Sequence, residues 1–223
     1  MYKEKISRYI DAHRKEMLED IGALCRINSV KGSYRIGKPY GEGCSEALRA
    51  ALHIAECYGF SINNYDNYVG TVDMNDKEAQ LDILAHLDVV PAGDGWTVTE
   101  PFEPVVKDGK LWARGADDDK GQGFIQLKAF EIAVKEGLLR CNVKFLIEGG
   151  EEIGSPGVEA FCKEHLDLLK CDVILVSDTS MVGLDTPSIT TGLRGLAYWE
   201  IEVTGPNRDL HSGIFGGTVA NPI

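Results

Sequence analysis

Strand-like runs that alternate with helical patterns constrain the fold of this 223-residue chain most. Short apolar runs at residues 81–87, 142–148 and 173–177 are typical of buried strands. Between them, residues 119–136 and 156–166 carry helical patterns. Because strands and helices alternate along the chain, the sequence predicts an α/β fold with a mostly parallel sheet flanked by helices.

The preceding and intervening segments supply further elements. Apolar side chains recur at helical spacing in residues 3–24 and 45–58. Residues 68–73 are expected to form a strand, and residues 101–115 a hairpin that turns at an Asp-Gly pair. We therefore expect helices to precede the first strand of the sheet.

The pattern of the chain changes after residue 186. Strand-like stretches follow at residues 188–192 and 196–204, and Pro206 then marks a turn. We expect one domain over residues 1–186 and the beginning of a second domain over residues 187–223.

The composition excludes several classes of protein. Apolar residues make up 43% of the chain and charged residues 26%, which is typical of a globular protein with a sizeable core. The formal net charge of -12 argues against nucleic acids and anionic membrane surfaces as partners. No apolar stretch reaches the ~20 residues of a membrane span, and the first residues lack the apolar core of a signal peptide. We expect a cytoplasmic protein whose six cysteines are reduced.

His86 and Asp88 come at the end of the apolar run at 81–87. Positions i and i+2 of a strand face the same side, so the two side chains can act together. A metal-binding imidazole commonly needs a carboxylate on or near its other nitrogen to fix the tautomer. By itself, however, such a pair is more often an ordinary surface or core pair.

Acidic residues cluster at three further positions. Asp117, Asp118 and Asp119 precede the helix at 119–136, and such neighbours repel each other unless cations or helix amides offset their charge. They can cap the helix, or one of them can bridge two metal ions. Neither a calcium-binding EF-hand loop nor a phosphate-binding P-loop fits this stretch.

The other acidic positions follow strands directly. Glu151 and Glu152 come after the run at 142–148, and Asp178 comes after the run at 173–177. Ligands collect beyond the carboxyl ends of strands in open α/β sheets. A cluster of carboxylates with one imidazole suits zinc or manganese, so the sequence predicts a metal site at this edge.

Several motifs in the chain resemble those of known peptidases, and they occur in the expected order. The first two resemble PepV-type dipeptidases and the others carnosinase and the cytosolic nonspecific dipeptidases: HLDVVPAGDGW (86–96), PFEPVVKDGKLWARGADDDKG (101–121), IEGGEEIGS (147–155), SD (177–178), TTGLRG (190–195) and DLHSGIFGG (209–217). The chain thus resembles the dinuclear zinc exopeptidase family, which also includes aminoacylases and the acetylornithine deacetylase/succinyl-diaminopimelate desuccinylase enzymes.

The resemblance implies a set of site residues. Two Zn²⁺ ions, with Mn²⁺ or Co²⁺ as substitutes, would be bound by His86, Asp118, Glu152 and Asp178. Asp118 would bridge both ions, His86 and Asp178 would bind the first ion, and Glu152 the second. Glu151 would be the general base, Asp88 would orient His86, and His211 would contact the carbonyl oxygen of the substrate. The family also implies a cis peptide bond between Asp118 and Asp119.

The implied activity is metal-dependent hydrolysis of peptide bonds, above all in dipeptides, by a hydroxide that bridges two zinc ions. Deacylation of N-acyl amino acids and a noncatalytic binding role are the alternatives. The resemblance places residues 1–186 in a phosphorylase/hydrolase-like catalytic domain and residues 187–223 in an inserted α+β lid domain, through which a homodimer would form. It also implies that the chain is the N-terminal half of such an enzyme, lacks the last histidine ligand of the second zinc, and is inactive alone.

Overall fold

The computed structural model describes residues 2–74 and 77–220. The chain divides into two compact units, residues 1–180 and 181–223. This division falls close to the boundary expected between residues 186 and 187. The functions assigned to the two predicted domains stay predictions.

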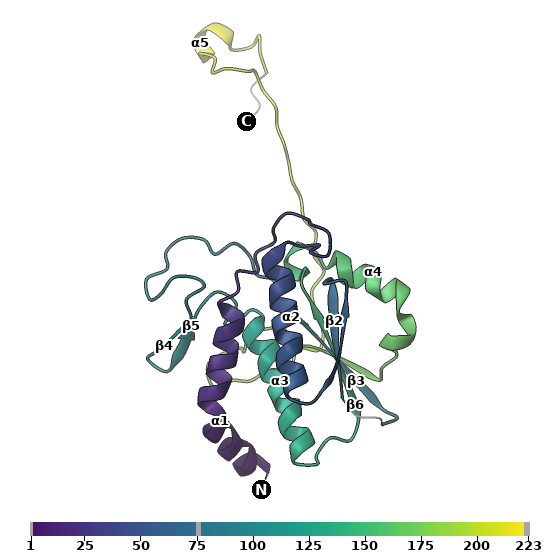
Figure 1. Cartoon of the computed structure of the whole chain (residues 1–223). Helices are drawn as coiled ribbons and strands as arrows, with labels where there is room; N and C mark the ends of the chain where they lie inside the picture. Colours follow the sequence, from purple (N-terminus) through teal and green to yellow (C-terminus); the bar gives the residue numbers. More distant parts are fainter. Residues whose placement is uncertain (1, 75–76, 221–223) are drawn as a thin grey trace. The chain divides into compact units, whose positions relative to one another are not determined.

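A five-stranded sheet forms the centre of the first unit (Figure 1). The three strands β6, β3 and β7 run parallel, whereas β2 is antiparallel to both β6 and β1, so the sheet is mixed. In spatial order, the strands are β1 (Ser61–Tyr65), β2 (Val69–Met74), β6 (Asn142–Glu148), β3 (Gln80–His86) and β7 (Val173–Val176). The predicted α/β class with flanking helices is confirmed, and the parallel pairing is confined to three strands. Strand β1 was not predicted from the sequence, because SINNY has neither an apolar run nor a regular alternation.

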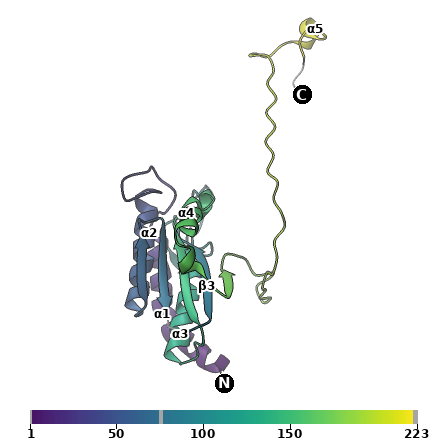
Figure 2. The same ribbon diagram turned by 90° about the vertical axis from the view of Figure 1, so that its right-hand side faces the viewer.

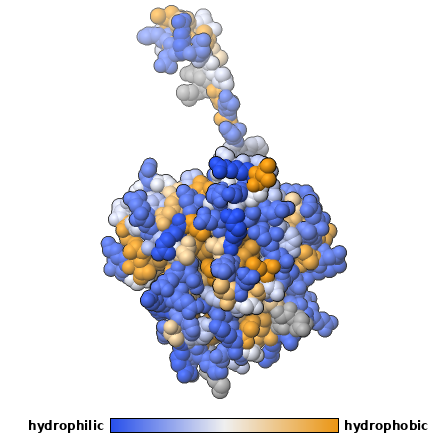
Figure 3. Space-filling view, in the orientation of Figure 1, coloured by the Kyte–Doolittle hydropathy of each residue, from blue (hydrophilic) through white to orange (hydrophobic). Residues whose placement is uncertain are grey.

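Helices cover both faces of this sheet, as Figures 1 and 2 show. The helices α1 (Tyr2–Cys25), α2 (Glu42–Cys57) and α3 (Lys120–Lys135) pack on one face around a core that includes Leu48 and Phe145. Helix α4 (Pro156–Glu164) packs on the other face. The solvent side of the first layer is mainly polar in Figure 3, with smaller apolar areas between the polar side chains. The helices predicted at 3–24, 45–58, 119–136 and 156–166 are therefore confirmed, and no end is shifted by more than three residues.

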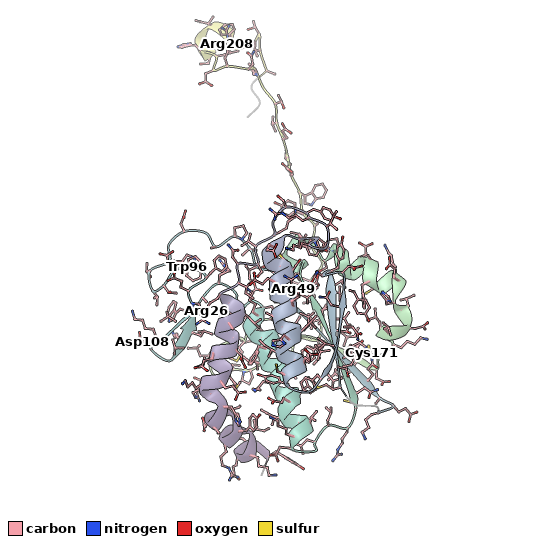
Figure 4. The ribbon with its side chains drawn as sticks, viewed as in Figure 1. Arg26, Arg49, Trp96, Asp108, Cys171 and Arg208 are labelled. Carbon is pink, nitrogen blue, oxygen red and sulfur yellow. The ribbon has the colours of Figure 1, made fainter. Side chains whose placement is uncertain are left out.

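A separate hairpin joins β4 (Val105–Lys107) to β5 (Lys110–Trp112). Asp108 and Gly109 form its turn with φ angles of 53° and 73°, which is the left-handed backbone that a tight hairpin turn requires. Asp108 is labelled at the tip of the hairpin in Figure 4. The predicted Asp-Gly turn is confirmed.

Strand β7 differs from its predicted environment. Its four apolar side chains are 37–64% exposed, so the interpretation of this run as a buried strand was wrong. The strand lies at the end of the strand order, beside β3. An apolar run predicts a strand, but it does not reveal whether a neighbouring element covers that strand.

The second unit contains little regular structure in its described residues. A short helix, α5 (Ser212–Phe215), is its one helix, and the stretches 188–192 and 196–204 have no ladder partner among the residues described. The prediction of strands there was wrong for this structure, because a strand exists only when its amides and carbonyls pair with a neighbour.

The first unit also contains η2 (Leu166–Leu169), a 3-10 helix after α4. None of the described helices has both the length and the apolar character to cross a membrane.

Candidate metal centre

His86 is the centre of the candidate site. It is the last residue of β3, and its side chain is only 2% exposed. Its Nε2 atom lies 3.0 Å from Asp118 Oδ1, 3.7 Å from Asp178 Oδ2 and 4.0 Å from Glu151 Oε2. The three carboxylates come from three different loops, so the fold and not sequence proximity brings them to one imidazole.

Two groups of potential ligands share this imidazole. His86, Asp118 and Glu152 form one, and His86, Glu151 and Asp178 form the other. Within each group, the ligand atoms all lie within 4.8 Å of one another. The structure therefore brings the four predicted metal ligands and the predicted base to the same edge of the sheet, where β3 and β6 end.

Asp88 contacts both His86 and the turn that carries the two glutamates. Its side chain is 1% exposed, and its backbone carbonyl oxygen lies 3.0 Å from His86 Nδ1, closer than its carboxylate at 3.4 Å. The carboxylate also accepts hydrogen bonds from the amides of Glu151 and Glu152, both at 3.0 Å. Asp88 thus contacts the imidazole and the turn that carries both glutamates.

The loop that carries Asp118 is tightly built. The peptide bond between Asp118 and Asp119 is cis, as predicted. Asp119 is fully buried and accepts a hydrogen bond from the backbone amide of His86 at 3.1 Å, a contact that was not predicted. Its other carboxylate oxygen has no hydrogen-bond partner among the described residues. A run of three acidic residues does not show which one turns inward, so no local pattern distinguishes Asp119 from its neighbours.

Lys120 fastens the same loop to the helical layer. Its side chain is fully buried, and Nζ donates to the carbonyl oxygens of Leu24 and Ile27 at 2.9 and 2.8 Å. These carbonyls lie at the end of α1 and just beyond it, where helix carbonyls lack intrahelical partners. Burial lowers the pKa of Lys120 to about 8. The lysine therefore connects the beginning of α3 to the end of α1.

The pKa values of several acidic groups in the site, and of His86, are raised. Burial raises the pKa of Asp119 to about 8, and it raises the pKa of Glu151 and of Glu152, with further increases from neighbouring carboxylates. Burial lowers the pKa of His86, but the hydrogen bond to Asp88 and the surrounding carboxylate charges outweigh this and raise it to about 10. Both directions show a site with excess negative charge, which a divalent cation would neutralise. One imidazole and several carboxylates are ligands that fit zinc or manganese.

His211 belongs to the second unit. It is exposed, and its Nδ1 accepts a hydrogen bond from the amide of Gly213 at 3.0 Å, at the beginning of α5. Its expected contact with a substrate carbonyl stays a prediction.

The fold and the site together define a class of protein: an α/β protein with candidate metal-binding residues clustered beyond the ends of its strands. The model of peptidase family M20/M25/M40 matches residues 83–211. The chain therefore belongs to this peptidase family, and the matched segment contains all seven predicted site residues.

Individual relatives carry dipeptidase names. The chain is 41% identical to the Beta-Ala-His dipeptidase of Homo sapiens over 243 aligned residues, which cover 99% of this chain and 47% of that protein. It is 42% identical to the Cys-Gly metallodipeptidase of Schizosaccharomyces pombe over 147 residues, which cover 63% of this chain and 31% of that protein. This chain therefore spans less than half the length of either relative.

A solved structure supports the fold. The di-peptidase Dug1p of Saccharomyces cerevisiae matches with a TM-score of 0.73 and 24% identity, over 96% of this chain and 49% of its own. At this identity the likeness establishes the fold alone.

Proposed function

We propose that this chain carries the metal centre of a dipeptidase that hydrolyses peptide bonds with the help of two divalent cations, zinc in the first instance. The observation that carries the proposal is the convergence of five side chains on one edge of the sheet. His86 contributes to two ligand groups there, one with Asp118 and Glu152 and one with Glu151 and Asp178. Together the two groups hold enough oxygen and nitrogen ligands, close to one another, for a pair of neighbouring cations.

The names of the relatives support the substrate class. One is named for Cys-Gly and the other for Beta-Ala-His, which are both dipeptides. A homodimer and a cytoplasmic location, which the motif resemblance implies for the family, are further proposals.

The ligand set fits divalent cations on chemical grounds. His86, Asp118, Glu152 and Asp178 would hold the ions, with Asp118 between them. When bound, such ions supply Lewis acidity toward the scissile carbonyl and lower the pKa of water. The raised pKa of Glu152 reflects burial and the nearby charge of Asp118, which a cation would offset.

Glu151 is the proposed general base. Its carboxylate lies 4.0 Å from His86 Nε2, and its side chain is 42% exposed, so it can reach both the ligand cluster and solvent. Its pKa is raised, which makes the carboxylate a stronger base. Such a base can accept a proton from water and return it to the leaving amine. His211 would stabilise the developing negative charge on the carbonyl oxygen.

Metal binding tests the proposal first. The purified chain is freed of metal and titrated with Zn²⁺ and with Mn²⁺ by calorimetry, and the same titration is made on His86→Ala. We expect the substitution to weaken binding at least about tenfold, because it removes the proposed imidazole ligand of the first ion. Asp11→Asn, on the exposed side of α1, is the matched control and should bind as the parent does.

Hydrolysis tests the substrate class. The longest natural form of the protein is assayed against dipeptides, tripeptides and N-acetyl amino acids in the presence of Zn²⁺ or Mn²⁺. We expect cleavage of dipeptides above the other two classes. A preference for N-acetyl amino acids would replace the proposal with deacylation, and unchanged metal binding by His86→Ala would refute the metal centre itself.

A further inference from the structure

A hydrogen bond to a buried carboxyl group joins the two sides of the turn that carries Glu151 and Glu152. Glu148 is the last residue of β6, and its side chain is only 2% exposed. Its Oε1 atom accepts a hydrogen bond from the hydroxyl of Ser155 at 2.9 Å. Neither residue was given a role above, and neither belongs to the ligand groups.

The turn between these two residues closes on itself. The amide of Ser155 donates to the carbonyl oxygen of Gly150 at 2.9 Å, and the amide of Gly154 donates to the carbonyl oxygen of Glu151 at 2.8 Å. These bonds enclose the short 3-10 helix η1 (Glu151–Ile153). The two proposed functional glutamates therefore lie on a loop whose ends meet at Gly150 and Ser155.

Ser155 itself has a backbone that serine rarely adopts. Its φ angle is 53°, in the left-handed region that favours glycine. Serine at such a position is strained relative to glycine, so its side chain must contribute something that a hydrogen atom cannot. Among the described residues, the hydrogen-bond partner of this hydroxyl is the carboxyl group of Glu148.

Other contacts fix the opposite side of the turn. The carboxylate of Asp88 accepts the amides of Glu151 and Glu152. The ring of buried Tyr40 lies against Gly150, where an added Cβ would come within 2.7 Å of it. Asp88 thus holds the first amides of the turn, Tyr40 packs against Gly150, and the hydrogen bond of Ser155 holds the end of the turn.

We propose that the Glu148–Ser155 hydrogen bond is a clamp that positions the Glu151–Glu152 turn over the metal site. Both residues act through the turn and touch no substrate, so they are positioning residues. The clamp itself is a property of the folded chain, whereas its importance for metal binding rests on the function proposed above. Loss of the hydroxyl leaves a buried carboxyl without its partner and lets the end of the turn open.

Three substitutions separate the clamp from simpler explanations. Ser155→Ala removes the hydroxyl, and Ser155→Gly removes it while relieving the left-handed backbone. Glu148→Gln keeps an oxygen that accepts the hydroxyl. Ser45→Ala is the matched control, because the Ser45 hydroxyl likewise makes one hydrogen bond, to the backbone carbonyl oxygen of Gly41 at 3.1 Å, and Ser45 is fully buried.

The first measurement needs no metal. Amide hydrogen exchange is followed by NMR in the metal-free chain at Glu151 and Glu152, with Phe145 in β6 as the internal reference. In both Ser155 variants we expect exchange at the two glutamates to increase at least about fivefold, because the hydrogen bond to the buried Glu148 carboxyl is lost. Exchange at Phe145 should stay constant, and Glu148→Gln and Ser45→Ala should leave the glutamate amides within about twofold of the parent.

The second measurement is the Zn²⁺ affinity of the same variants. We expect both Ser155 variants to bind Zn²⁺ about tenfold more weakly, because loss of a contact that supports a metal ligand commonly lowers the metal affinity by this amount. Glu148→Gln and Ser45→Ala should bind as the parent does. The Co²⁺ absorption spectrum of the loaded chain gives a further readout, since a displaced Glu152 changes the ligand geometry.

The outcomes are distinct. Parent-like exchange in Ser155→Gly would show that the hydroxyl holds nothing and would overturn the clamp. Equal losses in Ser45→Ala would reduce the effect to general destabilisation and would also overturn it. A parent chain that binds no divalent metal would contradict the proposed function, while the exchange rates would still decide on the clamp.

Discussion

Asp88 Oδ2 lies 3.0 Å from the backbone amide nitrogen of Glu152, so a carboxylate next to the imidazole also holds the proposed ligand of the second ion. Its Oδ1 lies 3.0 Å from the amide of Glu151 and 3.4 Å from His86 Nδ1. One buried carboxylate thereby couples both halves of the candidate metal centre. This contact extends the role expected for Asp88, which concerned His86 alone.

Asp88→Asn should therefore affect both halves. An asparagine amide has one acceptor oxygen, so its NH₂ group would face one of the two backbone amides as a second donor. We expect Zn²⁺ affinity to fall by about 10–100-fold, as measured by calorimetry, and amide exchange at Glu151 or Glu152 to increase. The exposed Asp11→Asn serves as the control. Parent-like affinity in Asp88→Asn would show that the ligands do not depend on this carboxylate.

The stability of the metal-free chain should decrease as pH rises from 5 to 8. Burial raises the pKa of Glu148 from 4.5 to about 7 and that of Asp119 from 3.8 to about 8. A folded state that binds more protons than the unfolded state loses stability as pH rises through this window. The raised pKa of His86, from 6.5 to about 10, acts in the same direction above pH 6.5.

Thermal unfolding in EDTA at four pH values tests this expectation. We expect the midpoint to fall by at least about 3 °C between pH 5 and 8, a shift that about 1 kcal/mol produces in a chain of this size. Glu148→Gln should make the dependence shallower. Added Zn²⁺ should reverse the trend, because metal binding requires deprotonated ligands. A midpoint that rises with pH in EDTA would contradict the assigned shifts.

Much of the fold could be predicted from apolar periodicity. The runs at 81–87 and 142–148 appear as β3 and β6, and the helical pattern at 119–136 appears as α3. The position of His86 and of the glutamate pair at one edge of the sheet was predictable for the same reason, since His86 lies at the end of the first run and the glutamates come shortly after the second. Where the end of a strand can be predicted, the position of the residues next to that end can be predicted as well.

Contacts made at a distance were not predictable. Asp119 bonds to the amide of His86, and Ser155 bonds to Glu148, across loops whose course no local pattern gives. The exposure of β7 was missed for a related reason, because covering elements are not encoded in the strand itself. Strands expected after residue 187 failed as well, since pairing needs a partner that local pattern does not provide.

Glu151→Gln should separate metal binding from turnover. Glutamine cannot accept a proton, but it has nearly the shape of glutamate and leaves the backbone amide free to donate to Asp88. In the longest natural form of the protein, we expect dipeptide turnover to fall by about 10²–10⁴-fold while Zn²⁺ stoichiometry is kept. Glu159→Gln on the exposed side of α4 is the control, and it should leave both quantities unchanged. Wild-type turnover in Glu151→Gln would assign the base to another residue.

Gly121→Ala should damage both the stability and the metal site, because the beginning of α3 approaches the loop before it too closely for any side chain. A Cβ atom at Gly121 would lie 2.0 Å from the carbonyl oxygen of Ala116. Alanine is about 1 kcal/mol better than glycine inside a helix, but a backbone clash of this size cannot be relieved by a rotamer change. The helix must therefore move away from residue 116, and Asp118 lies between the two.

We expect the free energy of unfolding to fall by about 1–3 kcal/mol, as overpacked sites generally show, and Zn²⁺ affinity to fall with it. Chemical denaturation and calorimetry measure the two effects. The control is Gly192→Ala, because an added Cβ at Gly192 meets no atom within 4 Å and its φ lies outside the left-handed range. If Gly121→Ala kept both the stability and the affinity of the parent, the close approach of α3 would not be what places Asp118 beside His86.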